Sequence, residues 1–337
     1  MNRKRENTQI IRSKKRHRRK YRREKLIVTI LLFVCCAGIF MIGKTLAQRL
    51  AGAVFQVPFF EGNEAYAGDV ISTGAVDLGH LNSRYAILTD SETGNIIGEN
   101  RGQERIYPAS LTKIMTAVIA VENTADLDEH ITMPSDIYDR LYAEDASMAG
   151  FLPGEEVRLR DLLYGVLLPS GAECCLTFAQ RIAGSEEAFV DIMNQKAQEL
   201  GMENTHFSNS TGLQEEDHYS TVGDIALLLQ YALKNEDFRS AFTSSRYSIP
   251  PTSQHPDGFT FHSTMFQYMQ SAQVPGGEII GGKTGYTQEA GLCLASAADV
   301  NGREYILVTA KAEGSHETEQ FHITDAVNVY SQLGDTV

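Results

Sequence analysis

Residues 107–117 read YPASLTKIMTA and place a serine and a lysine where they could act on each other. Pro108 suits the first position of a helix, so Ser110 would lie in the first turn and Lys113 three residues further along the same face. Eight of the eleven residues from Leu111 onward are apolar, which predicts a buried helix. Burial lowers the pKa of a lysine, and a neutral amine can take the proton of a serine hydroxyl and make it a nucleophile.

These two residues also have an ordinary structural explanation. The S-x-x-K pattern arises often by chance, and a serine is common at the start of a helix. A lysine can lay its carbon chain along apolar surface and keep its amine in water. On these residues alone, a catalytic pair and a structural pair both stay open.

A second serine, Ser170, lies in the stretch LLPSGAECC, residues 167–175. We predict that it occupies a turn of small residues between two helices, where its hydroxyl could relay a proton. The alternative is a serine that caps the second helix.

A third candidate is the stretch GGEIIGGKTGYT, residues 276–287, which also spells the phosphate-loop pattern G-x-x-x-x-G-K-T. A phosphate loop needs a hydrophobic strand before it and a helix that opens at Lys-Thr, and the sequence has neither. We therefore interpret this stretch as an edge strand. Lys283 would supply a cation and Thr284 a hydroxyl for a substrate carboxylate, and Gly285 would leave the backbone open to a peptide.

Charge is distributed unevenly along the 337 residues, whose net charge is −13. Residues 1–25 hold thirteen Lys/Arg and two acidic residues, and the rest holds 17 Lys/Arg and 41 Asp/Glu. Residues 26–43 carry no charge and would be about 27 Å long as a helix, near the thickness of a bilayer core.

We therefore predict a basic cytoplasmic tail (1–25), a transmembrane signal-anchor (26–43) and an extracytoplasmic remainder at a bacterial cell membrane. A basic run can also meet nucleic acid, but the adjoining apolar segment favours the membrane, and we expect no nucleic-acid partner. The sequence AYA at residues 65–67 leaves open whether the anchor is cleaved.

Residues 44–78 lack periodicity and are expected to form a stalk before a catalytic domain over 79–337. Turn signals at residues 91–94 and 301–302 predict β-hairpins near the two ends of that domain. Residues 126–232 are mainly helical in pattern, and a closing helix is expected over 316–333. We predict an α+β fold: an antiparallel sheet of N- and C-terminal strands, flanked by helices, with an inserted, mainly helical subdomain.

Three cysteines, Cys174, Cys175 and Cys293, lie beyond the apolar segment. Their number is odd and two of them are neighbours, so the sequence predicts buried free thiols rather than disulfides. The nine histidines include no H-E-x-x-H pattern, and the spacing of His316 and His322 is typical of a solvated helix. We expect neither a metal nor a cofactor.

Together and in this order, the motifs resemble those of serine-type D-alanyl-D-alanine carboxypeptidases, the low-molecular-mass penicillin-binding proteins. The resemblance covers roughly residues 80–334 and implies a β-lactamase/DD-peptidase-like fold. Longer stretches look like blocks of that family: IYPASLTKIMTA, FLPGEEVRLRDLLYGVLLPSGAE, MNQKAQELGMENTHFSNSTGL, HYSTVGDIALLLQYAL and GGKTGYTQEAGLCLASAA.

The resemblance implies that Ser110 is acylated by the terminal D-alanyl-D-alanine bond of peptidoglycan stem peptides. Lys113 would be its general base, and Ser170 would pass the proton toward the leaving D-alanine. Water would then release the acyl-enzyme, and β-lactam antibiotics would be trapped at the acyl stage.

Substrate binding follows from the resemblance in the same way. Lys283 and Thr284 would hold the terminal carboxylate, with Lys311 or His316 as further candidates. The substrate would lie along Gly285, and the backbone N–H groups of Ser110 and Tyr286 would form the oxyanion hole.

One position departs from the family pattern: the middle motif is usually Ser-x-Asn, and here Ala172 replaces the asparagine. The loss of one buried hydrogen bond, about 1–3 kcal/mol, would weaken an enzyme without abolishing it. Three alternatives stay open. They are a D,D-endopeptidase, a class A β-lactamase, which should also have that asparagine and a deacylating glutamate, and a non-catalytic protein that senses penicillin or binds the wall.

Overall fold

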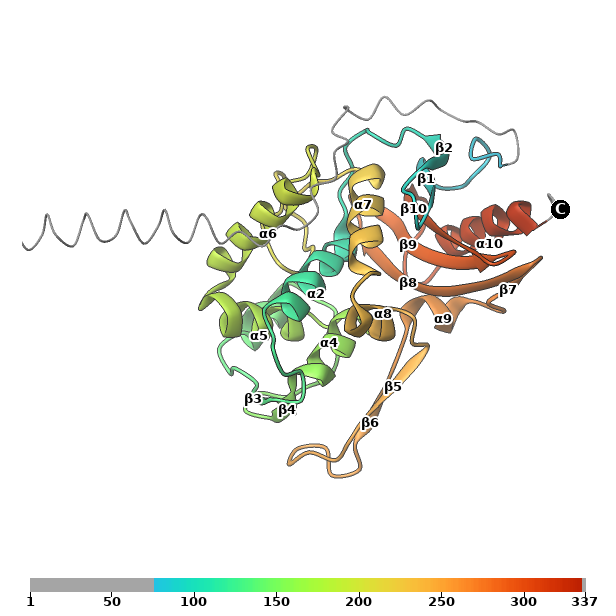
Figure 1. Ribbon diagram of the computed structural model, residues 1–337. Helices are drawn as coiled ribbons and strands as arrows, with labels where there is room; N and C mark the ends of the chain where they lie inside the picture. Colours follow the sequence, from blue (N-terminus) through green and yellow to red (C-terminus); the bar gives the residue numbers. More distant parts are fainter. Residues whose placement is uncertain (1–75, 335–337) are drawn as a thin grey trace, which may run out of the picture. The chain divides into compact units, whose positions relative to one another are not determined.

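The computed structural model describes residues 76–334, and its centre is a six-stranded sheet (Figure 1). The strand order is β2-β1-β10-β9-β8-β7, and every neighbouring pair is antiparallel. The strands are β1 (Tyr85–Asp90), β2 (Ile96–Asn100), β7 (Gln273–Val274), β8 (Gly277–Thr287), β9 (Gly291–Val300) and β10 (Arg303–Ala312). The predicted sheet of N- and C-terminal strands is confirmed.

Helices cover both faces of this sheet. One face carries α10 (Phe321–Gly334), and the opposite face meets a helical block that the chain forms between β2 and β5. The helices of the block are α2 (Lys113–Glu122), α3 (Tyr138–Ala143), α4 (Leu159–Leu167), α5 (Ala172–Ala183), α6 (Glu186–Leu200), α7 (Val222–Ala232) and α8 (Glu236–Phe242). The predicted inserted, mainly helical subdomain is confirmed.

The remaining strands form two short antiparallel pairs, and one further short α-helix follows them. They are the pair β3 (His130–Thr132) and β4 (Glu156–Arg158), the pair β5 (Arg246–Ile249) and β6 (Phe259–His262), and the helix α9 (Thr264–Tyr268). In Figure 1, β5 and β6 project away from the sheet.

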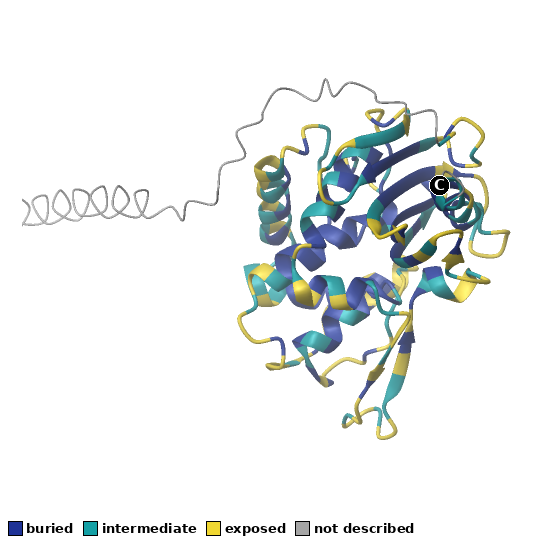
Figure 2. Ribbon diagram, turned by 45° about the vertical axis from the view of Figure 1, so that its right-hand side comes forward, coloured by how far each residue is buried: buried dark blue, intermediate teal, exposed yellow. Residues whose placement is uncertain are grey.

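Side-chain alternation explains why both faces of the sheet are apolar. In β10, Ile306 and Val308 face the helical block, whereas Leu307 between them faces α10. Nine of the ten residues of β9 are buried, and Figure 2 shows the central strands in the colour of buried residues. A strand that is buried on both sides reads as a continuous apolar run, as β9 does in the sequence.

The predicted hairpins are present at both ends of the domain. Between β9 and β10, Asn301 and Gly302 have φ angles of 55° and 73°, the left-handed pair that a tight two-residue hairpin turn requires. Between β1 and β2, Asp90 accepts the N–H of Thr93 at 2.8 Å and thereby closes the turn.

Local residues set the boundaries of two helices in the block. Ser185 caps α6 by accepting the N–H of Ala188 at 3.2 Å, and the helix ends at Gly201, whose φ is 79°. Thr221 caps α7 by accepting the N–H of Asp224 at 2.9 Å.

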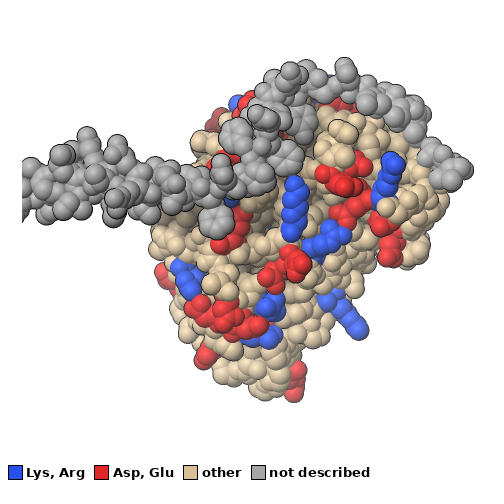
Figure 3. Space-filling view, in the orientation of Figure 1, with Lys and Arg blue, Asp and Glu red and all other residues tan. Residues whose placement is uncertain are grey.

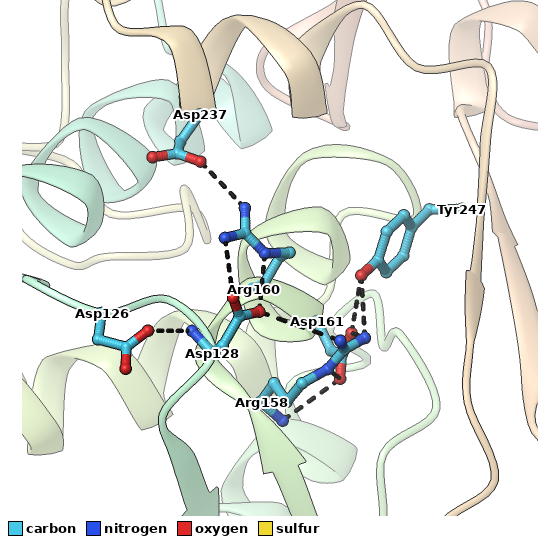
Figure 4. Close-up of polar contacts among 7 residues, drawn as sticks. All are labelled: Asp126, Asp128, Arg158, Arg160, Asp161, Asp237 and Tyr247. Carbon is cyan, nitrogen blue, oxygen red and sulfur yellow. Dashed lines mark hydrogen bonds and ion pairs between the residues drawn. The ribbon is translucent and has the colours of Figure 1, made fainter.

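A polar network connects the block to the projecting hairpin (Figure 4). Arg160 of α4 donates to Asp128 and Asp237, each at 3.0 Å. Asp161 accepts from Arg158 at 2.7 Å and from the hydroxyl of Tyr247 in β5 at 2.9 Å.

On the face drawn in Figure 3, Lys and Arg lie interspersed with Asp and Glu.

Two expectations for the C-terminal helix were wrong. The helix begins at Phe321 rather than near residue 316, because residues 315–320 form a turn in which Ser315 N–H donates to Thr318 at 2.8 Å. His322 lies on the buried face of α10 with 1% exposure, so it is not part of a solvated helix surface. Burial lowers the pKa of His322 to about 4.

The start of the folded domain precedes residue 79. Leu78, which the expected stalk included, is buried under α10, and Asp77 N–H donates to Gln332 at 2.8 Å. The expected tail, anchor and residues 44–75 of the stalk lie outside the described residues. Within residues 76–334, no helix has the length and apolar character to cross a bilayer.

Candidate active site

The first serine and lysine of the sequence motifs meet directly. Lys113 Nζ donates to Ser110 Oγ at 3.1 Å and to the carbonyl of Thr211 at 2.6 Å. Lys113 is the first residue of α2, and Ser110 lies just before it on the 3₁₀ helix η1 (Ala109–Thr112).

The 3₁₀ turn differs from the α-helical turn predicted for Ser110. In a 3₁₀ helix, side chains three residues apart eclipse each other, so this turn aligns Ser110 with Lys113 closely. Pro108 stands just before the turn, and Ala109 has a φ of 47°, an uncommon value for a residue with a Cβ. The backbone is therefore bent sharply at the serine.

The environment of Lys113 favours a neutral amine. The side chain is 3% exposed, and burial lowers its pKa, whereas Cys175 and Glu173 act in the opposite direction. Its two hydrogen-bond acceptors, a hydroxyl and a carbonyl, are both uncharged. The amine therefore combines restricted hydration with direct access to the hydroxyl proton of Ser110.

Ser170 contacts the second buried lysine. It lies between α4 and α5 and accepts a hydrogen bond from Lys283 Nζ at 2.9 Å. Gly171, and not Ser170, holds the cap position of α5, so the alternative of a helix-capping serine is wrong. Ser170 has a φ of 69°, and such strain, about 1–3 kcal/mol, is concentrated at functional sites.

Lys283 lies in β8, and its setting rules out the phosphate-loop alternative. Residues 277–287 form a continuous strand rather than a loop followed by a helix. Lys283 is fully buried and also donates to the carbonyl of Thr284 at 2.8 Å. Burial and the charge of Lys113 hold its pKa well below the usual range.

The expected edge strand is confirmed for the part of β8 that contains Lys283, Thr284 and Gly285. Within the described chain, β7 pairs only with Gly277 and Glu278, so residues 280–287 have a strand partner on one side only, β9. The hydroxyl of Thr284 lies 2.6 Å from that of Thr264. A strand edge without a strand partner is where an extended peptide can add to a sheet.

Two glycines let the backbone approach the nucleophile. A Cβ on Gly285 would stand 3.1 Å from the nitrogen of Ser110, and a Cβ on Gly212 would stand 1.9 Å from the carbonyl oxygen of Ala109. The ring of Tyr286 packs edge-on against His316 at 4.9 Å. The backbones of Ser110 and Tyr286 therefore lie on neighbouring segments, as the expected oxyanion hole requires.

The sequence reasoning missed the loop that holds Lys113 from the other side. Asn209 Oδ1 accepts the N–H groups of Thr211 and Gly212 at 3.2 and 2.8 Å, and its amide donates to Leu213. These bonds aim the carbonyl of Thr211 at Lys113. The run S-N-S-T-G is typical of a side-chain-stabilised turn, but no sequence signal marks which carbonyl such a turn presents.

The sequence reasoning also missed a histidine behind the nucleophile. His218 Nδ1 accepts the N–H of Ser208 at 3.0 Å, and Nε2 lies 2.7 Å from the hydroxyl of Thr112. Because Nδ1 accepts, Nε2 carries the proton in the neutral ring. Burial lowers the pKa of His218 to about 4, so the ring stays neutral at pH 7.

The family of D-alanyl-D-alanine carboxypeptidases, peptidase family S11, matches the chain over residues 72–314. The chain belongs to this family.

The thiols of Cys174, Cys175 and Cys293 are free and buried, as predicted.

Individual relatives agree with this assignment. The D-alanyl-D-alanine carboxypeptidase DacF of Bacillus subtilis is 35% identical over 245 residues, and the match covers 72% of this chain and 60% of that protein. The D-alanyl-D-alanine endopeptidase of Pseudomonas aeruginosa is 30% identical, with 74% of this chain and 76% of that protein covered.

A crystal structure of the Streptomyces K15 DD-transpeptidase has a similar fold, with a TM-score of 0.68 at 26% identity. The superposed part covers 76% of this chain and 98% of that one. The predicted β-lactamase/DD-peptidase-like fold is confirmed.

Proposed function

We propose that this chain is a serine D-alanyl-D-alanine carboxypeptidase that removes the terminal D-alanine from peptidoglycan stem peptides. The observation that carries the proposal is the contact of 3.1 Å between the buried amine of Lys113 and the hydroxyl of Ser110. A second buried amine, that of Lys283, lies in the half of β8 that pairs only with β9, and it would gain a proton opposite the carboxylate of a bound peptide.

In the proposed acylation step, neutral Lys113 removes the proton of Ser110, and Oγ attacks the carbonyl carbon of the penultimate D-alanine. The N–H groups of Ser110 and Tyr286 stabilise the oxyanion. When the peptide bond breaks, the leaving D-alanine takes a proton through Ser170. Water then attacks the ester, and Ser110 regains its proton. A β-lactam follows the same first step and stays attached.

The terminal carboxylate of the substrate is proposed to bind at Lys283 and Thr284. Lys311 and His316 are the two further candidates for binding this carboxylate. Lys311 donates a hydrogen bond to the carbonyl of Glu289, and the ring of His316 packs against the ring of Tyr286. The peptide would extend along Gly285, where a side chain would meet the nitrogen of Ser110.

Ala172 is the position at which preference for substrate is open. It starts α5, is buried, and supplies no amide. The carbonyl of Thr211 provides Lys113 with a polar partner in its place. Cleavage of cross-links is the second candidate function, supported by the similarity to the P. aeruginosa endopeptidase.

The proposal is tested with the purified full chain and its Ser110→Ala variant. We expect the wild type to release D-alanine from a synthetic stem pentapeptide and to form a β-lactam adduct at Ser110. The variant should do neither while keeping its thermal transition. Equal release by both proteins would show that Ser110 is not the nucleophile, and release only from a cross-linked dimer would favour the endopeptidase.

We further propose that residues 26–43 anchor the protein in the bacterial membrane, with residues 1–25 in the cytoplasm and the catalytic domain outside. The support is thirteen basic residues followed by 18 uncharged ones. Protease added to intact protoplasts should degrade the catalytic domain and spare the tail. Protection of the catalytic domain would refute this topology.

A further inference from the structure

Glu173 is a buried carboxylate beside the proposed catalytic groups. It is the second residue of α5 and is fully buried. Its Oε1 accepts the N–H groups of Ala149 and Gly150 at 2.7 and 2.8 Å. Its Oε2 has no hydrogen-bond partner within residues 76–334. A buried carboxylate oxygen without a partner is costly, so its surroundings must account for it.

The unpartnered oxygen lies against the turn that holds Ser170. A Cβ on Gly171 would stand 2.9 Å from Oε2 of Glu173. One residue further on, the N–H of Ala172 donates to the carbonyl of Ser147 at 2.8 Å. These contacts fasten the segment of residues 147–150 to the turn, so the position of the Ser170 hydroxyl depends on Glu173.

Glu173 also acts on the charge of Lys113, whose protonated form its negative charge favours. The groups that bear on this charge are the ones that face Lys113, namely Glu173, Cys174, Cys175, Lys283 and His218, together with Tyr138, which faces Glu173.

Most of these groups are neutral at pH 7. Burial raises the pKa of Cys175 to about 12 and that of Cys174 well above its usual value. Burial also raises the pKa of Tyr138 and lowers that of His218 to about 4. Glu173 is the one member of this set that can supply a negative charge.

Two influences act on Glu173 itself. Burial raises its pKa, whereas the N–H groups of Ala149, Gly150 and Phe151 stabilise the anion and lower it. Its place in the first turn of α5 also favours negative charge, because free N–H groups point toward the start of a helix.

We propose, building on the function proposed above, that Glu173 is the buried counter-charge of Lys113 and a positioning residue for the Ser170 turn. Its negative charge opposes the effect of burial on Lys113 and so keeps that amine a stronger base. General bases work best when their pKa lies near the operating pH.

Two substitutions separate the charge of Glu173 from its shape. Glu173→Gln keeps the size and removes the charge, and Glu173→Asp keeps the charge and shortens the side chain. The readout is the rate of acylation by a fluorescent penicillin between pH 5 and 10, measured with the full chain. This rate rises with pH as Lys113 loses its proton.

We expect Glu173→Gln to move the rising limb to lower pH by about one unit and to lower the plateau, because a nearby opposite charge changes a pKa by about one to three units. Glu173→Asp should lower the melting temperature but leave the limb where it is in the wild type. Glu155→Gln is the matched control, because Glu155 is also fully buried and accepts the N–H of Leu152 at 2.8 Å. Its limb should not move.

An unmoved limb in Glu173→Gln, or an equal shift in Glu155→Gln, would overturn the inference. If Glu173→Gln does not fold, Glu173→Asp decides, because a limb displaced to lower pH in that variant contradicts a role for the charge. A wild-type chain that forms no adduct and releases no D-alanine would instead refute the proposed function on which the inference rests.

Discussion

At the scale of single residues, the site depends on an amine that loses its proton easily. Lys113 reaches this state because it is buried and has only uncharged acceptors, Ser110 and the carbonyl of Thr211. The site also has a strained φ at Ser170 and a close approach of Gly285 to the backbone of Ser110. Both features accompany the packing of separate chain segments around the hydroxyl of Ser110.

Replacement of Lys113 tests this view. Lys113→Ala should slow acylation by a β-lactam by about 10²–10⁴, the range that general-base catalysis contributes. Lys113→Arg should be as slow, because a guanidinium does not lose its proton in a protein. The rate is measured by mass spectrometry of the adduct over time, with thermal unfolding as the check on folding. An arginine variant that acylates at the wild-type rate would contradict the role of a neutral base.

At the scale of elements, helix ends and turns fix the positions of the catalytic side chains. The Ser170 turn exists because α4 ends at Leu167 and α5 begins at Ala172. The Thr211 carbonyl is held by a loop that Glu186 of α6 also contacts, through the hydroxyl of Ser210 at 2.7 Å. A stable start of α6 therefore supports the site indirectly.

The cap of α6 gives a prediction about stability. Ser185→Ala should lower the free energy of unfolding by about 1 kcal/mol, because the N–H of Ala188 loses its acceptor. Ser185→Gly is the matched control and should cost only a few tenths of a kcal/mol, since glycine is tolerated at caps. Urea denaturation of both variants measures the difference. Equal losses in the two would show that the hydroxyl is not needed.

At the scale of the whole molecule, two histidines are buried as neutral rings, His218 behind the nucleophile and His322 under α10. Each has its pKa lowered to about 4, below the value near 6.5 in an unfolded chain. Between these values the unfolded chain binds a proton that the folded chain does not. The free energy of unfolding is therefore highest above pH 6.5, and it decreases as the pH falls from 6.5 toward 4.

This linkage predicts that acidification from pH 7 to pH 5 lowers the free energy of unfolding by about 2 kcal/mol for each of the two histidines. His322→Gln should make the dependence of unfolding free energy on pH shallower by about one proton. The wild-type slope is the reference for this variant. The slope is obtained from urea denaturation at several pH values. An unchanged slope in His322→Gln would contradict the assignment of this ring as neutral.

The sequence by itself determined the chemistry-bearing residues, the α+β plan and the turns at both ends of the sheet. These features depend on local signals: the spacing of Ser110 and Lys113, the Lys-Thr-Gly run and the Asn301–Gly302 turn. Such signals reside in side-chain identity and can be read without knowing what packs nearby.

Only the tertiary structure decided which groups meet. It brought Lys283 to Ser170, aimed the carbonyl of Thr211 at Lys113, and buried His322, which the sequence had suggested was solvated. A backbone carbonyl looks the same in every residue, and burial results from distant segments that pack together. The direction of a backbone carbonyl and the burial of a side chain both depend on distant segments, so the local sequence could not predict them.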